Sequence, residues 1–134
     1  MRATLVDANI FLDLVTNDPV WGEWSASQLA AAISGGPLLI NDVIYAEISI
    51  RFSEIARLDE MLADFRVAHE AIPRKALFEA GKAFKRYRAA GGLRSSVLPD
   101  FFIGAHAAAA DLRLLTRDAK RYRTYFPTVE RISP

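Results

Sequence analysis

Apolar positions along this chain follow two patterns: short continuous runs, and longer stretches in which apolar residues recur every three or four positions. The short runs at residues 2–6, 38–40, 112–116 and 128–132 predict strands, the last of them at a sheet edge. The longer stretches predict helices at residues 21–34, 42–54, 57–65, 100–111 and 118–126, with a further helix from Pro73 to the glycine pair at 91 and 92. Because strands and helices alternate, we expect a three-layer α/β/α sandwich around a mostly parallel central sheet.

Local signals mark the ends of two of these elements. Gly35, Gly36 and Pro37 form a clear stop for the helix at residues 21–34. Asn41 and Asp42 are both able to cap the helix that follows, and we assign Asp42 to this capping role.

Length and composition limit the class of protein. A chain of 134 residues is long enough for one real core and too short for two, so we expect a single domain over residues 1–134. The 51% hydrophobic and 25% charged residues are typical of a folded soluble protein. No apolar run approaches the roughly 18 to 20 residues of a membrane span, so no contact with a membrane is expected.

Charge and cysteine content exclude several kinds of chemistry. The chain has no cysteine, which rules out disulfides, a thiolate nucleophile and cysteine metal sites, and makes a cytoplasmic protein the default expectation. The net charge of +1 gives no argument for a nucleic-acid partner from bulk charge alone. If such a partner exists, basic residues must gather locally.

Four acidic residues lie where the predicted topology brings chain segments together. Asp7 follows the first predicted strand, and Asp118 follows the strand at residues 112–116. Because parallel strands end at the same edge of a sheet, we expect these two carboxylates to emerge together. Asp100 follows Pro99 at the start of the alanine-rich helix that leads into the strand before Asp118, and Glu47 borders the apolar stripe of its helix.

Several carboxylates at one edge repel each other. At about 4 Å and an effective dielectric constant near 20, each pair costs on the order of 4 kcal/mol. An Mg²⁺ or Mn²⁺ ion, which prefers oxygen ligands, would offset the repulsion among these carboxylates. Such a site activates water and neutralises phosphoryl charge, which points to phosphodiester hydrolysis. The two histidines have no zinc-type spacing.

Each acid, taken alone, also has a purely structural interpretation. Asp100 and Asp118 are both suitable for capping or charging the first turn of a helix. Glu47 has a potential i,i+4 ion-pair partner in Arg51. Asp7 is harder to explain structurally, because an acid at the end of a buried strand is unfavourable without a partner.

Four sequence blocks together resemble the PIN-domain ribonucleases, specifically the VapC-type toxins of bacterial toxin–antitoxin pairs. The blocks are residues 5–9 (LVDAN), 41–47 (NDVIYAE), 98–107 (LPDFFIGAHA) and 114–118 (LLTRD). They occur in the family's order and spacing and span almost the whole chain, and the third is the most specific. The resemblance implies a PIN-like fold.

The resemblance also implies roles for individual residues. Asp7, Glu47, Asp100 and Asp118 would form an acidic quartet around Mg²⁺ or Mn²⁺, with Asp7 and Asp100 as direct ligands. Asn9 and Thr116 match positions whose polar side chains support the acids by hydrogen bonding. Proteins of this type cut tRNA or ribosomal RNA in single-stranded or loop regions. They form homodimers and are silenced by a small VapB-like antitoxin.

Basic residues suited to phosphate contacts occur in two groups. Lys85 and Arg86 belong to a cluster on the helix after Pro73, and Arg94 precedes the Asp100 block. Arg117 lies next to Asp118 in the second group, which also includes Lys120, Arg121 and Arg123. Such contacts would position RNA without reading its sequence. A solvated helix face is the alternative for Lys85 and Arg86.

Tyr87, Tyr122 and Tyr125 have the chemistry to stack on unpaired bases, but their helical spacing favours packing.

Other functional classes remain open. A haloacid-dehalogenase phosphatase would share the aspartate after the first strand, but it expects a second acid where Asn9 stands. A receiver-like signalling module would need a phosphoacceptor aspartate ending a middle strand, and residues 38–41 offer none. Within the resembled family, the alternatives are a non-toxin RNA-processing nuclease and a PIN-like domain that only binds partners.

Overall fold

The computed structural model describes residues 2–92 and 98–134. Within these ranges the chain forms five strands and seven helices. In chain order they are β1 (Thr4–Val6), α1 (Ala8–Val15), α2 (Gly22–Gly35), β2 (Leu38–Ile40), α3 (Asp42–Ser49), α4 (Ile55–Asp64), β3 (Val67–His69), α5 (Arg74–Ala89), α6 (Leu98–Ala109), β4 (Arg113–Leu115), α7 (Lys120–Tyr125) and β5 (Arg131–Ile132). None of the helices in these ranges is long and apolar enough to cross a membrane.

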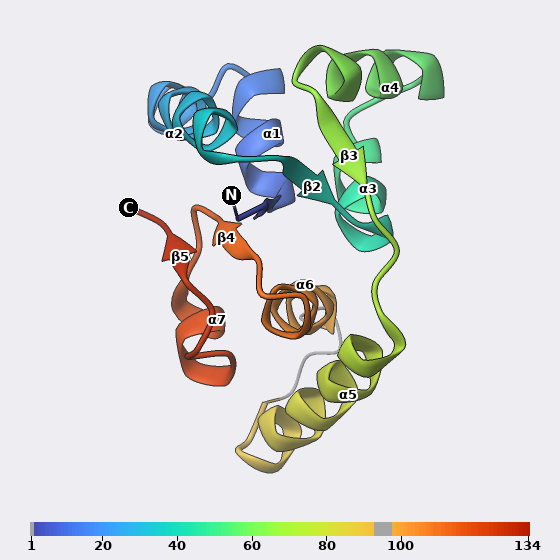
Figure 1. Cartoon of the computed structure of the whole chain (residues 1–134), viewed down its shortest axis with the longest axis vertical. Coiled ribbons are helices and arrows are strands. Elements are labelled where there is room, and N and C mark those ends of the chain that lie inside the picture. The colour runs from blue at the N-terminus through green and yellow to red at the C-terminus, as the bar shows by residue number, and fades with distance from the viewer. Residues whose placement is uncertain (1, 93–97) are drawn as a thin grey trace.

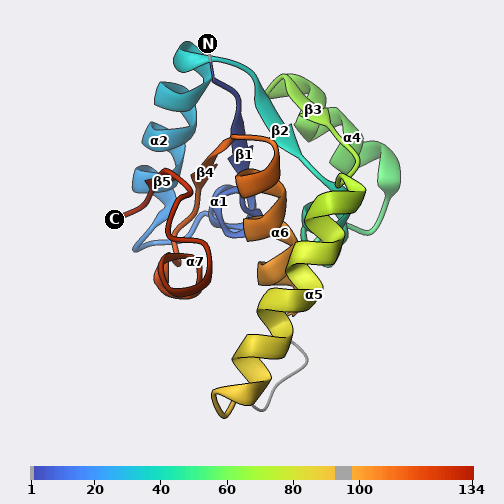
Figure 2. The same cartoon turned by 60° about the horizontal axis from the view of Figure 1, so that its bottom comes forward.

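The strands form one sheet in the order β3-β2-β1-β4-β5, and every neighbouring pair is parallel. Figure 1 shows α1 and α2 on one side of the strands and α5 and α6 on the other. Figure 2 shows α5 and α6 side by side in front of the strands. The predicted three-layer α/β/α sandwich with a parallel sheet is therefore confirmed.

Three details differ from the sequence prediction. Helix α1 (Ala8–Val15) is not among the predicted helices, because its short segment contains a continuous apolar run at residues 10–12 and no clear helical period. β3 was not expected, because its short segment is mostly exposed and lacks a continuous apolar run. The residue that caps α3 is Asn41, whose side chain accepts a hydrogen bond from the Ile44 amide at 2.9 Å. The assignment of Asp42 to this role is wrong. Asp42 already lies in the first helical turn, and its carboxylate contacts His69 at 2.5 Å.

The carboxyl ends of the central strands bring polar residues together. Asp7, Asn41 and Thr116 directly follow β1, β2 and β4, and all three are buried. The Asp7 amide donates to the Leu115 carbonyl at 2.9 Å, which ties the end of β1 to the end of β4. In open parallel sheets this edge is where ligand-binding residues gather.

Helix α6 reaches this edge through close packing by small residues. Gly104, Ala105 and Ala107 are buried. A Cβ atom at position 104 would overlap the ring of Phe126, the residue that follows α7. The absence of a side chain at Gly104 therefore permits the observed distance between α6 and α7.

Candidate active site

A cleft of about 220 Å³ lies at the carboxyl edge of the sheet. All four acids singled out from the sequence line it, although they come from four separate segments. The lining residues are Asp7, Ala8, Asn9, Leu12, Glu47, Ile50, Asp100 and Asp118. The fold therefore brings the predicted acidic group to one place.

Asp7 is the most buried of these acids, with 6% of its surface exposed. As the N-cap of α1, it accepts from the Ala8 amide at 2.8 Å. Its other carboxylate oxygen accepts from the Thr116 hydroxyl at 2.8 Å and from the Tyr122 hydroxyl at 3.1 Å. Burial, reinforced by the charge of Asp100, raises the pKa of Asp7 to about 6 despite these donors.

Glu47 lies on the face of α3 that borders the cleft. Its Oε1 atom is buried and accepts no hydrogen bond from any residue in the described ranges. Burial raises the pKa of Glu47 to about 7, and the charges of Asp7 and Asp100 contribute to this rise. Among the described residues no ion pair joins Glu47 to Arg51, so the structural alternative for this acid finds no support.

Asp100 lies in the first turn of α6 and has a cationic partner. The Arg121 guanidinium donates to its carboxylate at 2.5 Å, and both side chains are about one-third exposed. Burial raises the pKa of Asp100 and the charge of Asp118 adds to this effect, while Arg121 opposes it. Asp118 itself is exposed at the rim of the cleft.

Asn9 and Thr116 occupy the supporting positions that the sequence indicates. The Thr116 hydroxyl donates to Asp7 and lies 3.4 Å from the Asn9 amide nitrogen. The Asn9 carbonyl oxygen accepts from the Arg117 amide at 3.1 Å. These bonds connect α1 to the loop after β4 and limit the motion of the Asp7 carboxylate.

Arg117 has a different environment from the one expected of a phosphate contact. Its Nε and Nη2 atoms donate to the two carboxylate oxygens of Asp13 at 2.9 and 2.8 Å, and its guanidinium lies over the Trp21 ring. Asp13, only 2% exposed, also accepts from the Ser25 hydroxyl at 2.7 Å. Arg117 therefore joins the site loop to α1 and α2, and its role in RNA binding stays a prediction.

Replacing Arg117 by alanine is expected to lower the free energy of unfolding by about 3 kcal/mol, because a buried Asp13 carboxylate would lose its charged partner. Urea denaturation measures this change. Arg123→Ala is the matched control: Arg123 is exposed and forms no ion pair within the described ranges, so it should change stability by less than about 0.5 kcal/mol. Equal destabilisation by the two substitutions would contradict a structural role for the Arg117–Asp13 pair.

The other residues predicted to contact RNA are Lys85, Arg86 and Arg94. Lys85 and Arg86 are exposed on α5, but neither lines the acidic cleft, and Arg86 borders a separate pocket against α6. Their role in RNA binding stays a prediction. Arg94 lies outside the described residues.

Two residues of α7 contact the acids, although sequence reasoning did not assign them to the site. Arg121 was one member of a basic group, and Tyr122 was expected to pack. Tyr122 does pack, but its hydroxyl also reaches Asp7. Burial and the nearby acids hold the pKa of Tyr122 well above its ordinary range, so its phenol remains a hydrogen-bond donor.

The cleft has the chemistry that a hard divalent cation requires. The charged side chains that line it are all carboxylates. The pKa of Asp7, Glu47 and Asp100 is raised, and the buried Oε1 of Glu47 accepts no hydrogen bond within the described ranges. In the parts of the chain that the structure describes, no three such side chains already form a metal-ligand set.

Comparison with known proteins gives one family and several structural relatives. The family model of the PIN domain matches residues 4–127. The chain is similar to VapBC2 from Rickettsia felis bound to a fragment of promoter DNA, with a TM-score of 0.74 and 17% identity over 98% of both chains. It is also similar to VapBC-1 from nontypeable Haemophilus influenzae, with a TM-score of 0.74 and 19% identity over 98% of this chain and 97% of that one.

A toxin–antitoxin complex from Klebsiella pneumoniae matches at a TM-score of 0.66 and 21% identity, over 89% of each chain. At these identities the likeness concerns the fold. Curated protein sequences give no significant match.

Proposed function

The chain belongs to the PIN domain family, and from this membership and its acidic cleft we propose that it is a metal-dependent endoribonuclease, the toxin of a toxin–antitoxin pair. Its substrates would be tRNA or ribosomal RNA loops. The observation that supports this most directly is the convergence of Asp7, Glu47, Asp100 and Asp118 on one cleft. Solved structures with this fold include VapBC proteins and a complex described as toxin–antitoxin, which supports the biological role.

The proposed hydrolysis assigns distinct tasks to the chain's residues. Asp7 and Asp100 would hold Mg²⁺ or Mn²⁺, with Glu47 and Asp118 completing the charge. The bound ion would supply positive charge for the phosphoryl oxygens and favour deprotonation of the attacking water. Thr116 and Tyr122 hold the Asp7 carboxylate in one orientation through their hydroxyl donors. Arg121 neutralises Asp100 before the ion binds.

Glu47 is also suited to accepting a proton. Its pKa of about 7 lies near physiological pH, and its buried Oε1 has no donor within the described ranges. A cation beside the carboxylates would lower this pKa, so ion binding would release the proton that Glu47 holds in the metal-free protein. The raised pKa therefore supports Glu47 as part of the ion site.

The proposed partners follow from the family and the structural relatives. We propose a VapB-like antitoxin as the silencing partner and a homodimer as the assembly of the toxin. Light scattering of the purified chain, alone and with the product of a neighbouring gene, tests both.

The purified protein is expected to cleave single-stranded RNA in the presence of Mg²⁺ or Mn²⁺ and to lose this activity in EDTA. Re-addition of excess Mn²⁺ should restore cleavage, which separates ion removal from damage to the protein. Gel electrophoresis of an end-labelled RNA measures the products. Cleavage that persists in EDTA, or labelling of the protein by acetyl phosphate, would contradict the nuclease proposal and favour another use of the acids.

A further inference from the structure

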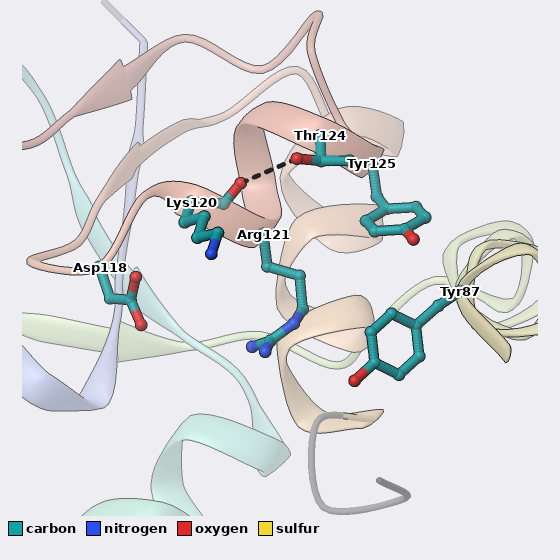
Figure 3. Close-up of a pocket in the computed structure, with 6 residues that line it drawn as sticks. All are labelled: Tyr87, Asp118, Lys120, Arg121, Thr124 and Tyr125. Atoms are coloured by element: carbon teal, nitrogen blue, oxygen red, sulfur yellow. Dashed lines mark hydrogen bonds between the residues drawn. The ribbon is translucent and has the colours of Figure 1, made fainter. Parts of the chain in front are cut away.

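A second pocket adjoins the acidic cleft on the side of α7. It has a volume of about 240 Å³ and is lined by Tyr87, Asp118, Lys120, Arg121, Thr124 and Tyr125. Asp118 lines both this pocket and the acidic cleft, so the two hollows are neighbours. Figure 3 shows the Arg121 side chain extending between Asp118 and the two tyrosine rings.

Two aromatic side chains form one wall of the pocket. The rings of Tyr87 and Tyr125 meet edge to face, with centroids 6.0 Å apart. Tyr125 also packs edge to face on the buried Phe101, at 5.2 Å between centroids. These contacts hold the rings in place, and each tyrosine remains partly exposed. The wall is therefore a preformed aromatic surface, which costs little conformational entropy when a ligand stacks on it.

Two cationic side chains, Lys120 and Arg121, share the polar lining with Asp118 and Thr124. Lys120 is exposed and forms no ion pair with any residue in the described ranges. Arg121 lies with its guanidinium 5.9 Å from the centre of the Tyr87 ring while it also pairs with Asp100. Arg121 lines the pocket and also pairs with Asp100, so its side chain connects the two hollows.

Aromatic faces beside cations, at the rim of a cleft, suit one class of ligand. A nucleotide offers a flat base to stack and a phosphate to pair with, and stacking and phosphate pairing are the two main interactions in single-strand binding. The volume is below the roughly 300–1,000 Å³ of pockets that enclose drug-sized ligands, which favours a single base over a longer segment.

We propose that this pocket binds one nucleotide of the RNA next to the cleavage site, with its base on Tyr87 or Tyr125 and its phosphate on Lys120 and Arg121. The inference rests on the proposed ribonuclease function and adds a substrate subsite to it. Because stacking is tolerant of base identity, the subsite selects unpaired RNA more than a sequence. An RNA duplex, whose bases are already stacked, would not enter it.

The direct test measures binding without cleavage. Fluorescence anisotropy of a labelled oligouridine is recorded with the Asp7→Asn protein, alone and with a second substitution. Lys120→Ala is expected to weaken binding about fivefold and to reduce the slope of log affinity against log salt by about 1. Lys82→Ala is the matched control, because Lys82 is an exposed lysine on α5 that does not line the pocket. It should change affinity by less than about twofold.

Substitutions in the aromatic wall test the stacking component. Tyr125→Leu is expected to weaken oligouridine binding about tenfold, whereas Tyr125→Phe, which keeps the ring, should retain most of the affinity. Tyr45→Leu, on α3 outside the pocket, is the aromatic control. Thermal melting confirms that each variant is folded, and Lys120→Ala tests the same pocket without altering the packed rings.

The possible results separate this inference from the proposed function. Normal oligouridine affinity in both Lys120→Ala and folded Tyr125→Leu would overturn the subsite. Weakened binding to a protein partner with unchanged RNA affinity would also overturn it, by assigning the pocket to a protein. If the wild-type chain failed to cleave RNA while its oligouridine binding depended on Lys120 and Tyr125, the nuclease proposal would fail and the nucleotide pocket would stand.

Discussion

Replacing Asp7 by asparagine is expected to reduce RNA cleavage about 10³-fold and to leave the metal-free protein more stable at pH 8. The loss of activity follows because the substitution removes the most buried negative charge of the cleft, and one well-placed electrostatic contact contributes on the order of 10² to 10³ in rate. The stability gain follows because asparagine avoids burying a charge whose pKa is raised to about 6.

This opposite change in activity and stability distinguishes a functional acid from a structural one. Chemical denaturation in EDTA should show a gain of about 1–3 kcal/mol for Asp7→Asn at pH 8. Asp118→Asn is the control for stability, since Asp118 is exposed and its loss should change unfolding by less than about 0.5 kcal/mol. An Asp7→Asn protein that cleaves RNA at the wild-type rate would exclude Asp7 from the active site.

The metal-free wild-type protein is expected to lose stability as the pH rises from about 4 to about 7. In the folded state the pKa of Asp7 is raised from 3.8 to about 6 and that of Glu47 from 4.5 to about 7. The folded protein therefore binds more protons than the unfolded chain in this window, and its stability decreases with rising pH. For Asp7 alone, a shift of about two units corresponds to about 3 kcal/mol.

Urea denaturation in EDTA at pH 4 and at pH 8 measures this effect. Because other ion pairs respond to pH as well, the informative quantity is the difference between wild type and Asp7→Asn at each pH. That difference should be close to zero near pH 4 and reach its full size above pH 7. Mg²⁺ at 100 times its dissociation constant should restore about 2.7 kcal/mol to the wild type at pH 8. A difference that does not vary with pH would contradict the raised pKa of Asp7.

Much of the candidate site could be predicted because its main residues have strong local signals. Asp7 and Thr116 lie directly after buried apolar strands, and parallel pairing brings such positions to one edge. Asp100 is predictable from the proline and the alanine-rich helix around it. The supporting bonds of Asn9 and Thr116 followed from the resemblance, which assigns polar residues to those positions.

The remaining features depend on contacts between residues far apart in the sequence. Arg117 and Asp13 are separated by 104 positions, and Arg121 and Asp100 by 21, so periodicity contains no information about either pair. The Tyr122 hydroxyl reaches Asp7 across 115 positions, and only its packing role was visible in the helical spacing. The short strand β3 was missed for a related reason, since its place at the sheet edge depends on pairing with β2 and not on its own composition.

The candidate site also depends on the small size of Gly104, a residue that carries no charge and does not line the acidic cleft. Any side chain there would displace the Phe126 ring, which directly follows α7, and so shift the helix whose first turn carries Arg121 and Tyr122 to Asp100 and Asp7. In a genetic screen for chains that have lost toxicity, substitutions at position 104 should therefore appear together with substitutions of the acids. Such isolates would retain every reactive group and fail because the groups are too far apart. The smallest residue of α6 thus permits the close packing of α6 on α7 that holds Arg121 and Tyr122 beside the acids.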